Sequence, residues 1–248
     1  AIGYNTLGSL TTGAQNAALG KSALDAVTVG DNNVGVGPDA GGSITSGYNN
    51  VAVGGAALFT STTTANNTAV GHNAMYNSTC SAGTAMGYQA LRDATGNNNS
   101  AFGYQAAKQT TSGVYNVAIG LQALHNNTTG SNNTALGYQA LFSNTGSNNT
   151  AVGLHSMINN TSGTYNCAVG RSALEQNTTA NNNTAVGYGA LTLNTTGPQN
   201  TAVGMEALYN NTTGQNNTGV GRSALVANTT GEANTSVGAY TLDANTTG

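Results

Sequence analysis

The sequence offers few side chains that could carry chemistry. It contains three histidines, eight acidic residues and five basic residues among 248. A catalytic site needs a nucleophile, a base and a group that orients the base, all within hydrogen-bonding reach. Arg171 with Glu175, and Arg92 with Asp93, are better explained as solvated ion pairs. The three histidines lie far apart, at unrelated positions of the repeat described below, so we expect no metal site and no enzyme: His72, His125 and His155.

Two further patterns imitate functional motifs. The stretch GVGPDAGG at 35–42 resembles a dinucleotide-binding fingerprint through Gly35 and Gly37, but Pro38 stands where a helix would have to begin. Cys80 and Cys167 are about five repeats apart, which places them beyond the reach of a disulfide within the chain. We therefore expect no nucleotide, no other cofactor and no internal disulfide.

Composition narrows the class of protein. Only 5% of residues are charged and the net charge is −3, whereas a nucleic-acid-binding surface needs clustered Lys and Arg. No apolar run approaches the 18 or so residues of a membrane span. The chain begins in mid-pattern without a signal peptide, so we expect it to be a section of something longer.

One period runs through the whole sequence. The Gly that follows an apolar residue recurs every 16 or 17 positions: 3, 20, 37, 54, 71, 87, 103, 120, 137, 153, 170, 187, 204, 221 and 238. A unit this short, with alternation in TAVG and a Gly-rich turn, is typical of one coil of a β-solenoid. We predict an all-β, parallel β-roll of about fifteen 17-residue coils over 1–248, one tandem array roughly 70 Å long.

In a stacked solenoid each repeat position becomes a row along the axis. The residue before the aligned Gly is apolar in every copy, and the residue four after it is usually Leu. We predict that both rows face the interior, while the Gly takes a positive φ. The expected core residues are Val53, Leu58, Val70, Leu91, Ile119, Leu124, Leu136, Leu141, Val186, Leu191, Val203 and Leu208.

The row two residues before the Gly holds nothing larger than Ser. Because neighbouring strand residues point to opposite sides, this row should face outward if the apolar row faces inward. An outward row limited to tiny side chains indicates close packing against a second chain. The expected chain–chain contacts are Ala52, Ala69, Ala118, Ala135, Ala185 and Ala202.

The stretches NNVAVG at 49–54 and YNVAIG at 115–120 resemble the head repeats of trimeric autotransporter adhesins, the YadA-like left-handed parallel β-roll, and are similar to repeats of phage tail fibres. The resemblance covers the whole chain, although this repeat is longer and often has Thr where the family favours Val. It implies a homotrimer, a left-handed coil, and binding to host-surface or matrix molecules, both glycans and proteins.

Asn-x-Ser/Thr sequences are abundant, and a ladder rich in Asn and Thr would generate them by chance. If the chain meets a glycosylation system, a stripe of sugars is expected on the loops, at Asn126, Asn177, Asn194, Asn228 and Asn245. A column of tyrosines after the Gly, including Tyr88 and Tyr104, fits either side packing or sugar binding.

The sequence therefore favours a structural or adhesive fibre segment, outside the cell, on its surface or on a virion. Self-association into a homotrimer or fibril is expected, without nucleic acid and without membrane insertion of this segment. The alternatives are a phage receptor-binding shaft and a carbohydrate- or ice-binding solenoid. Against ice binding, Val34, Val51, Val117 and Cys167 replace Thr in the strand, which suggests that this column points inward.

Overall fold

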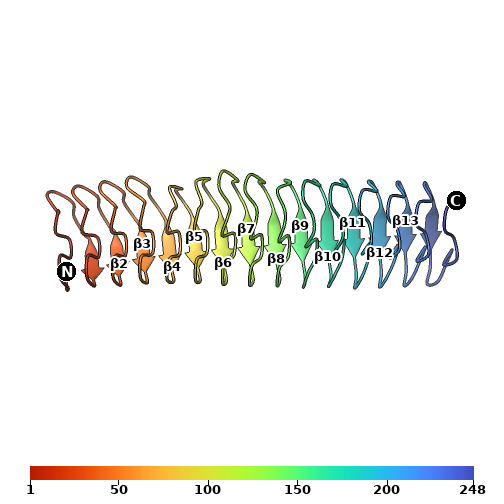
Figure 1. Ribbon diagram of the computed structural model, residues 1–248, viewed down its shortest axis with the longest axis horizontal. Coiled ribbons are helices and arrows are strands. Elements are labelled where there is room, and N and C mark those ends of the chain that lie inside the picture. Colours follow the sequence, from red (N-terminus) through yellow and green to blue (C-terminus); the bar gives the residue numbers. More distant parts are fainter. The chain divides into compact units, whose positions relative to one another are not determined.

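The computed structural model describes all 248 residues and contains strands, turns and loops but no helix. The chain divides into two compact units, which are described separately: unit 1 is Ala1–Gln122 and unit 2 is Ala123–Gly248. Apart from the first repeat, which forms no strand, each repeat contributes one short strand, and Figure 1 shows these strands as a series of arrows coloured along the sequence.

Unit 1 contains seven strands of three residues each. Consecutive strands pair in parallel, with partners 16 or 17 residues apart, such as Val34 with Val51. The bounds are β1 (Ala17–Leu19), β2 (Val34–Val36), β3 (Val51–Val53), β4 (Thr68–Val70), β5 (Thr84–Met86), β6 (Ser100–Phe102) and β7 (Val117–Ile119).

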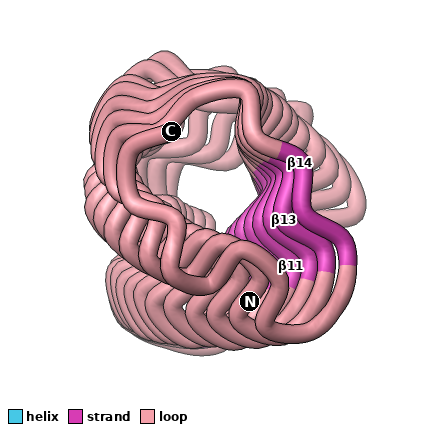
Figure 2. Tube along the Cα trace, turned by 90° about the vertical axis from the view of Figure 1, so that its right-hand side faces the viewer, coloured by secondary structure: helices cyan, strands magenta, loops and turns pink.

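Unit 2 has the same construction. Its strands also pair in parallel and in order, for example Thr184 with Thr201. The bounds are β8 (Thr134–Leu136), β9 (Thr150–Val152), β10 (Cys167–Val169), β11 (Thr184–Val186), β12 (Thr201–Val203), β13 (Thr218–Val220) and β14 (Thr235–Val237). Figure 2 shows that the strands occupy one side of the coils, while loops and turns form the other sides.

The predicted parallel β-solenoid with one repeat per turn is confirmed. The predicted number of coils was too high, because the structure has about 13 turns of roughly 17 residues. The first repeat forms only an isolated bridge between Ile2 and Leu19 instead of a strand.

The turns depend on residues in left-handed conformations. The aligned Gly has φ between 123° and 140° in all copies, as predicted, and a Cβ on Gly187 would lie 2.5 Å from the carbonyl oxygen of Gly204. Three further positions per coil also have positive φ, including the core Leu itself, with Leu191 at 52°. A left-handed residue other than Gly costs roughly 1–2 kcal/mol, so each of these turns must be held in place by its neighbours.

The predicted Leu row forms the core. Leu58, Leu91, Leu124, Leu141, Leu191 and Leu208 are all completely buried, as are Met75 and Met157 in the same row. Burying one such side chain contributes about 1.5–3 kcal/mol, which is repeated on every coil. This half of the core prediction is confirmed.

The prediction that the apolar residue before the aligned Gly also faces the interior was wrong. Ile119, Leu136, Val186 and Val203 are 36–43% exposed, and Val53 and Val70 are half-buried. These side chains project from the outer side of their strands rather than into the coil. Equivalent residues of successive coils pair as predicted, but the opposite side of the strand faces the interior.

The Ala row was therefore also misplaced. Ala52, Ala69, Ala118, Ala135, Ala185 and Ala202 have no exposed surface, so they cannot contact another chain. They are small because the interior is narrow: a Cβ on Gly35, which occupies this row in β2, would lie 2.7 Å from Cγ of Leu24 and 3.1 Å from the carbonyl oxygen of Ala40. The limit on size reflects packing inside one chain.

Buried asparagines form a ladder beside each sheet. The residue before each strand is usually Asn, and its amide bonds to the equivalent Asn of the preceding coil: Asn50 Nδ2 donates to Asn33 Oδ1 (3.0 Å) and to the carbonyl oxygen of Thr64 (2.9 Å). Because most of these amides find partners in the coils above and below, the polar groups are buried at little cost; the exception is the amide nitrogen of Asn183, which has no hydrogen-bond partner.

Candidate functional site: the outward face of the sheet

The surface most suited to function is the outer side of the strands, which we call the outward face. It consists of the first and third residue of every strand. In unit 2 these residues are Thr134, Leu136, Thr150, Val152, Cys167, Val169, Thr184, Val186, Thr201, Val203, Thr218, Val220, Thr235 and Val237. None of them is charged, and their burial ranges from half-buried to exposed.

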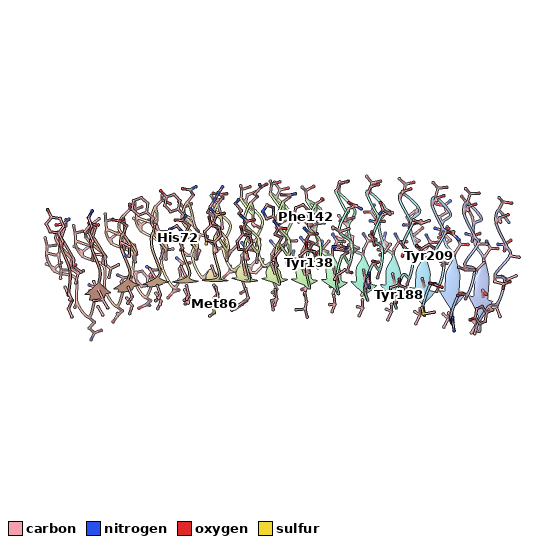
Figure 3. All side chains as sticks on the ribbon, turned by 60° about the horizontal axis from the view of Figure 1, so that its bottom comes forward. His72, Met86, Tyr138, Phe142, Tyr188 and Tyr209 are labelled. Atoms are coloured by element: carbon pink, nitrogen blue, oxygen red, sulfur yellow. The ribbon has the colours of Figure 1, made fainter.

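The outward face of unit 1 is more apolar. Three of its strands begin with Val and one with Ala, and the exposed members include Leu19, Met86, Val117 and Ile119. Figure 3 shows Met86 projecting from its strand away from the interior of the coil. No charged residue interrupts this face either.

The geometry of the outward face follows from the sheet. Seven strands spaced about 4.8 Å apart, each three residues wide, give a strip about 34 Å long and 10 Å wide on each unit. This uncharged strip of roughly 350 Å², partly apolar and partly Thr, is comparable in area to surface patches through which proteins bind partners. The strand threonines Thr184, Thr201 and Thr218 make no hydrogen bond within the chain through their hydroxyls, so these groups are available to an external partner.

The strand Thr column faces outward, which corrects the prediction that it points inward. Thr134, Thr150 and Thr235 are exposed, and Val117 in the same column is 36% exposed. Val in this column therefore does not indicate burial, and it gives no reason against an ice-binding surface.

The tyrosine column forms stacks along the coils. In unit 1 the rings of His72, Tyr88 and Tyr104 stack at centroid distances of 5.9 and 5.2 Å. In unit 2 Tyr138 lies against His155, and Arg171 lies over the ring of Tyr188. Each of these rings therefore has a side chain of a neighbouring coil against it, although the tyrosines remain 41–50% exposed. This arrangement favours side packing over sugar stacking.

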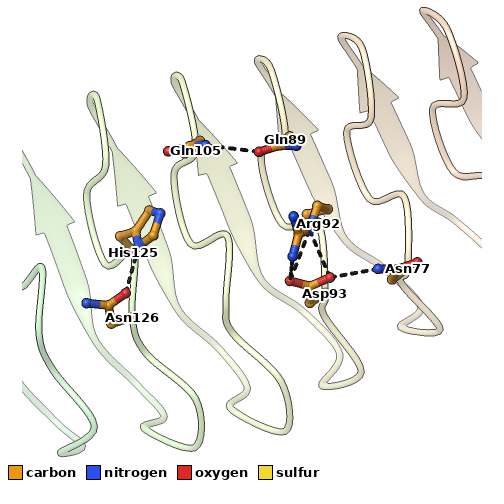
Figure 4. Close-up of polar contacts among 7 residues, drawn as sticks. All are labelled: Asn77, Gln89, Arg92, Asp93, Gln105, His125 and Asn126. Atoms are coloured by element: carbon orange, nitrogen blue, oxygen red, sulfur yellow. Dashed lines mark hydrogen bonds and ion pairs between the residues drawn. The ribbon is translucent and has the colours of Figure 1, made fainter.

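Next to these rings, polar side chains bond from coil to coil (Figure 4). Gln105 Nε2 donates to Gln89 Oε1 at 2.9 Å. Arg92 and Asp93 form the expected ion pair at 2.7 Å, and Asn77 donates to the same carboxylate. Partial burial acts to raise the pKa of Asp93, but the hydrogen bonds from Arg92 and Asn77 lower it overall.

Two of the three histidines belong to the aromatic stacks described above, and His125 also packs against an aromatic ring, that of Phe142, at 5.1 Å. His125 Nδ1 also bonds Asn126 Oδ1 at 2.7 Å (Figure 4). No three His, Cys, Asp or Glu side chains lie close enough to hold a metal ion. The molecule has no pocket, and none of its elements is a helix long and apolar enough to span a membrane.

The predicted glycosylation sites differ in their burial. Asn177, Asn194 and Asn228 are completely buried and use their amide nitrogens inside the coil, so the prediction of sugars at these positions was wrong for the folded chain. Asn126 and Asn245 are half-buried. The mistake arose because the NTT loops look polar and exposed in the sequence, while the first residue of each points inward.

Both cysteines are free thiols. Cys80 is buried, and this burial raises the pKa of its thiol despite a hydrogen bond with Ser78. Cys167 lies half-buried on the outward face of β10, where most other strands carry Thr or Val.

Sequence reasoning expected a ladder rich in Asn and Thr, but it missed that the asparagines of this ladder form part of the interior. The signal was present, since Asn recurs at the same two positions of the repeat although Ser, Asp or Gln would serve equally on a surface. No protein-family model, curated protein or solved structure matches the chain.

Proposed function

We propose that the chain is a structural or adhesive segment of a fibre outside the cell, on its surface or on a virion, and that it self-associates through the outward face. The observation that carries this proposal is the uninterrupted, uncharged outward face on every strand of both units. Such a role needs no catalysis and no cofactor. The polar loops on the other sides of the coil would then be displayed to host-surface or matrix glycans and proteins.

A second copy of the same chain is the best-matched partner. The side chains of the outward face repeat with the strand spacing of about 4.8 Å, and only a surface with the same spacing stays in register along the whole strip. The strip of each unit offers about 350 Å², compared with the roughly 800 Å² that each partner contributes to a standard interface. Three copies would form the homotrimer that the resemblance to YadA-like heads implies, and open-ended packing would form a fibril.

The decisive experiment is the mass of the native assembly, measured by light scattering and native mass spectrometry. The wild-type chain should have the mass of several chains, most simply three. The double variant Val186→Lys/Val203→Lys places charges on the outward face and should be monomeric, with an unchanged circular dichroism spectrum. A double variant on the loop side, Thr196→Lys/Thr213→Lys, changes the charge equally at exposed positions and should assemble like the wild type.

A monomeric wild-type chain would contradict the proposal. It would favour the second candidate, a carbohydrate- or ice-binding solenoid, because the outward face would then remain open to solvent. The observation in favour of this candidate is the row of strand hydroxyls at Thr184, Thr201 and Thr218 without intramolecular partners. A phage receptor-binding shaft would use the same self-associating face as a cellular adhesin.

A further inference from the structure

Twelve of the eighteen Asn-x-Ser/Thr sequences fall into two structurally distinct rows. The first, which we call the exposed sequon row, lies two residues before the strand. Each of its Asn residues is exposed and has a φ between 58° and 61°. Its members are Asn66, Asn98, Asn132, Asn148, Asn182 and Asn216.

The second row, the buried sequon row, lies three residues after the core Leu or Met in unit 2. Each of its Asn residues has no exposed surface. Each amide nitrogen donates inside the coil, as Asn177 Nδ2 does to Asn160 Oδ1 at 2.7 Å and to the carbonyl oxygen of Ala180 at 3.2 Å. Its members are Asn127, Asn160, Asn177, Asn194, Asn211 and Asn228.

The exposed row has the opposite properties. The backbone N–H of Asn182 is bound to the carbonyl oxygen of Thr164 (3.1 Å), which anchors the turn, but its side-chain amide makes no hydrogen bond within the chain. Thr184, two residues later, belongs to the outward face and has a hydroxyl without an internal partner. Both groups that define an N-glycosylation acceptor, the Asn amide and the hydroxyl two residues on, are therefore free and on the surface of the single chain, so the reaction would have to precede assembly through the outward face.

We propose that the folded solenoid is an acceptor for N-linked oligosaccharide at the exposed sequon row and that folding closes the buried sequon row to the same reaction. The donor class is a polyprenyl-diphosphate-linked oligosaccharide. The bond between the sugar C1 and the diphosphate oxygen breaks, C1 bonds to the Asn Nδ2, the diphosphate leaves with the electron pair, and the amide loses one proton.

A sugar on the buried row is incompatible with the fold. Attached at Asn194 Nδ2, it would occupy the space between coils and displace the bonds to Asn177 Oδ1 and to the carbonyl oxygen of Gly197. Modification of this row before folding would therefore prevent its coils from stacking. The chain must fold before, or out of reach of, an enzyme that glycosylates unfolded chains.

Spacing sets the expected occupancy within the exposed row. Asn132 and Asn148 lie on consecutive coils, about 4.8 Å apart along the axis, whereas Asn182 and Asn216 are two coils apart. Because oligosaccharides on consecutive coils would collide, a single chain should carry a sugar at Asn132 or Asn148 but not at both.

The test uses the folded, full chain from a bacterial host without N-glycosylation, both as wild type and as the Val186→Lys/Val203→Lys variant, whose outward face stays open. It is incubated with an oligosaccharyltransferase and a polyprenyl-diphosphate heptasaccharide, and each site is quantified by peptide mass spectrometry. Synthetic peptides spanning Asn177, Asn182 and Asn216 report the intrinsic reactivity of each sequence. We expect modification of Asn182 and Asn216, and at least tenfold less modification of Asn177 and Asn194 than of the matching peptide.

Two variants serve as matched controls. Thr184→Val should abolish modification of Asn182 alone, and it should fold because β2, β3 and β7 carry Val at this position. Thr179→Val removes the sequon of buried Asn177, where unit 1 has Val29, and should leave the pattern unchanged.

Modification of the buried row in the folded chain at the rate of the peptides would overturn the proposal. So would a folded chain whose exposed row stays unmodified while the peptides react. The mass of the assembly, measured before the reaction, tests self-association separately, so the failure of either proposal can be recognised without the other.

Discussion

Units 1 and 2 have the same backbone path but place different types of side chain at one buried position of each coil. The position three residues after the core Leu row, which we call the corner row, is Asn in every coil of unit 2, and each amide from Asn144 onward donates to the preceding one, at 2.6–3.4 Å. In unit 1 the corner row is a mixture of apolar and hydroxyl side chains: Leu10, Val27, Ile44, Ser61, Ser78, Ala94 and Thr110.

This difference shows that the corner row does not require one residue type. An apolar side chain buried there needs apolar contacts, and a polar side chain needs hydrogen-bond partners. The amide ladder of unit 2 meets the requirement cooperatively, since each Asn is both donor and acceptor to its neighbours. Unit 1 meets it less completely, because the hydroxyl of Thr110 is buried without a hydrogen-bond partner.

The largest effect is expected from breaking the ladder of unit 2. Asn194→Val installs the residue that unit 1 has at Val27, but it removes the donor to Asn177 Oδ1 and the acceptor of Asn211 Nδ2. Two buried amide groups lose a partner, so the free energy of unfolding should fall by about 3 kcal/mol. Urea denaturation followed by circular dichroism measures this loss.

The control for that variant is Thr196→Val, two residues away but exposed. It should change the free energy of unfolding by less than about 0.5 kcal/mol. Equal effects of the two substitutions would show that the amide ladder contributes nothing specific.

A smaller effect of opposite sign is expected in unit 1. Thr110→Val replaces the buried, unpaired hydroxyl with a methyl group of similar size and should stabilise the unit by about 1 kcal/mol. Thr212→Val makes the same change in unit 2, where the hydroxyl donates to the carbonyl oxygen of Thr229 at 3.0 Å, and should destabilise it. Thermal unfolding of both variants checks the two signs, and a loss of stability in Thr110→Val would contradict this account of unit 1.

The smallest effect concerns the charges of unit 1. Asp93 has a lowered pKa in the folded chain, so its contribution to stability is present above the pKa of the unfolded chain, about 3.9, and is lost as the pH falls through the folded pKa. Because the pair with Arg92 is partly exposed, this contribution is about 0.5 kcal/mol. The stability difference between wild type and Asp93→Asn should be present at pH 6 and absent near pH 2. A difference that persists at pH 2 would exclude the carboxylate as its cause.

Much of the architecture could be predicted from the repeat alone. The period placed one short strand in each coil, and the Leu row identified half of the core, because a large aliphatic side chain recurring at one position has few places to go except the interior. The positive φ of the aligned Gly followed from its presence in every copy. The left-handed φ of Leu191 and its equivalents gave no comparable signal, since Leu normally avoids that conformation and adopts it here only under tertiary constraint.

The candidate surface was harder to predict. A three-residue strand such as Thr-Ala-Val offers two opposite assignments, and both satisfy the alternation of side chains. The choice of Val186 as interior and Ala185 as interface follows the usual preference for burying the larger apolar residue. It fails here because the core Leu of the neighbouring coil already fills the narrow interior, leaving room only for a methyl group.

Sequence by itself therefore determined the length of the repeat, the parallel stacking and the Leu core, because these depend on a period that every copy repeats. Only the tertiary structure decided which side of each strand faces outward, which asparagines are buried and which remain open to modification. These outcomes depend on the width of the space enclosed by one turn of backbone, and that width is set by three left-handed turns whose conformations the residue types do not reveal.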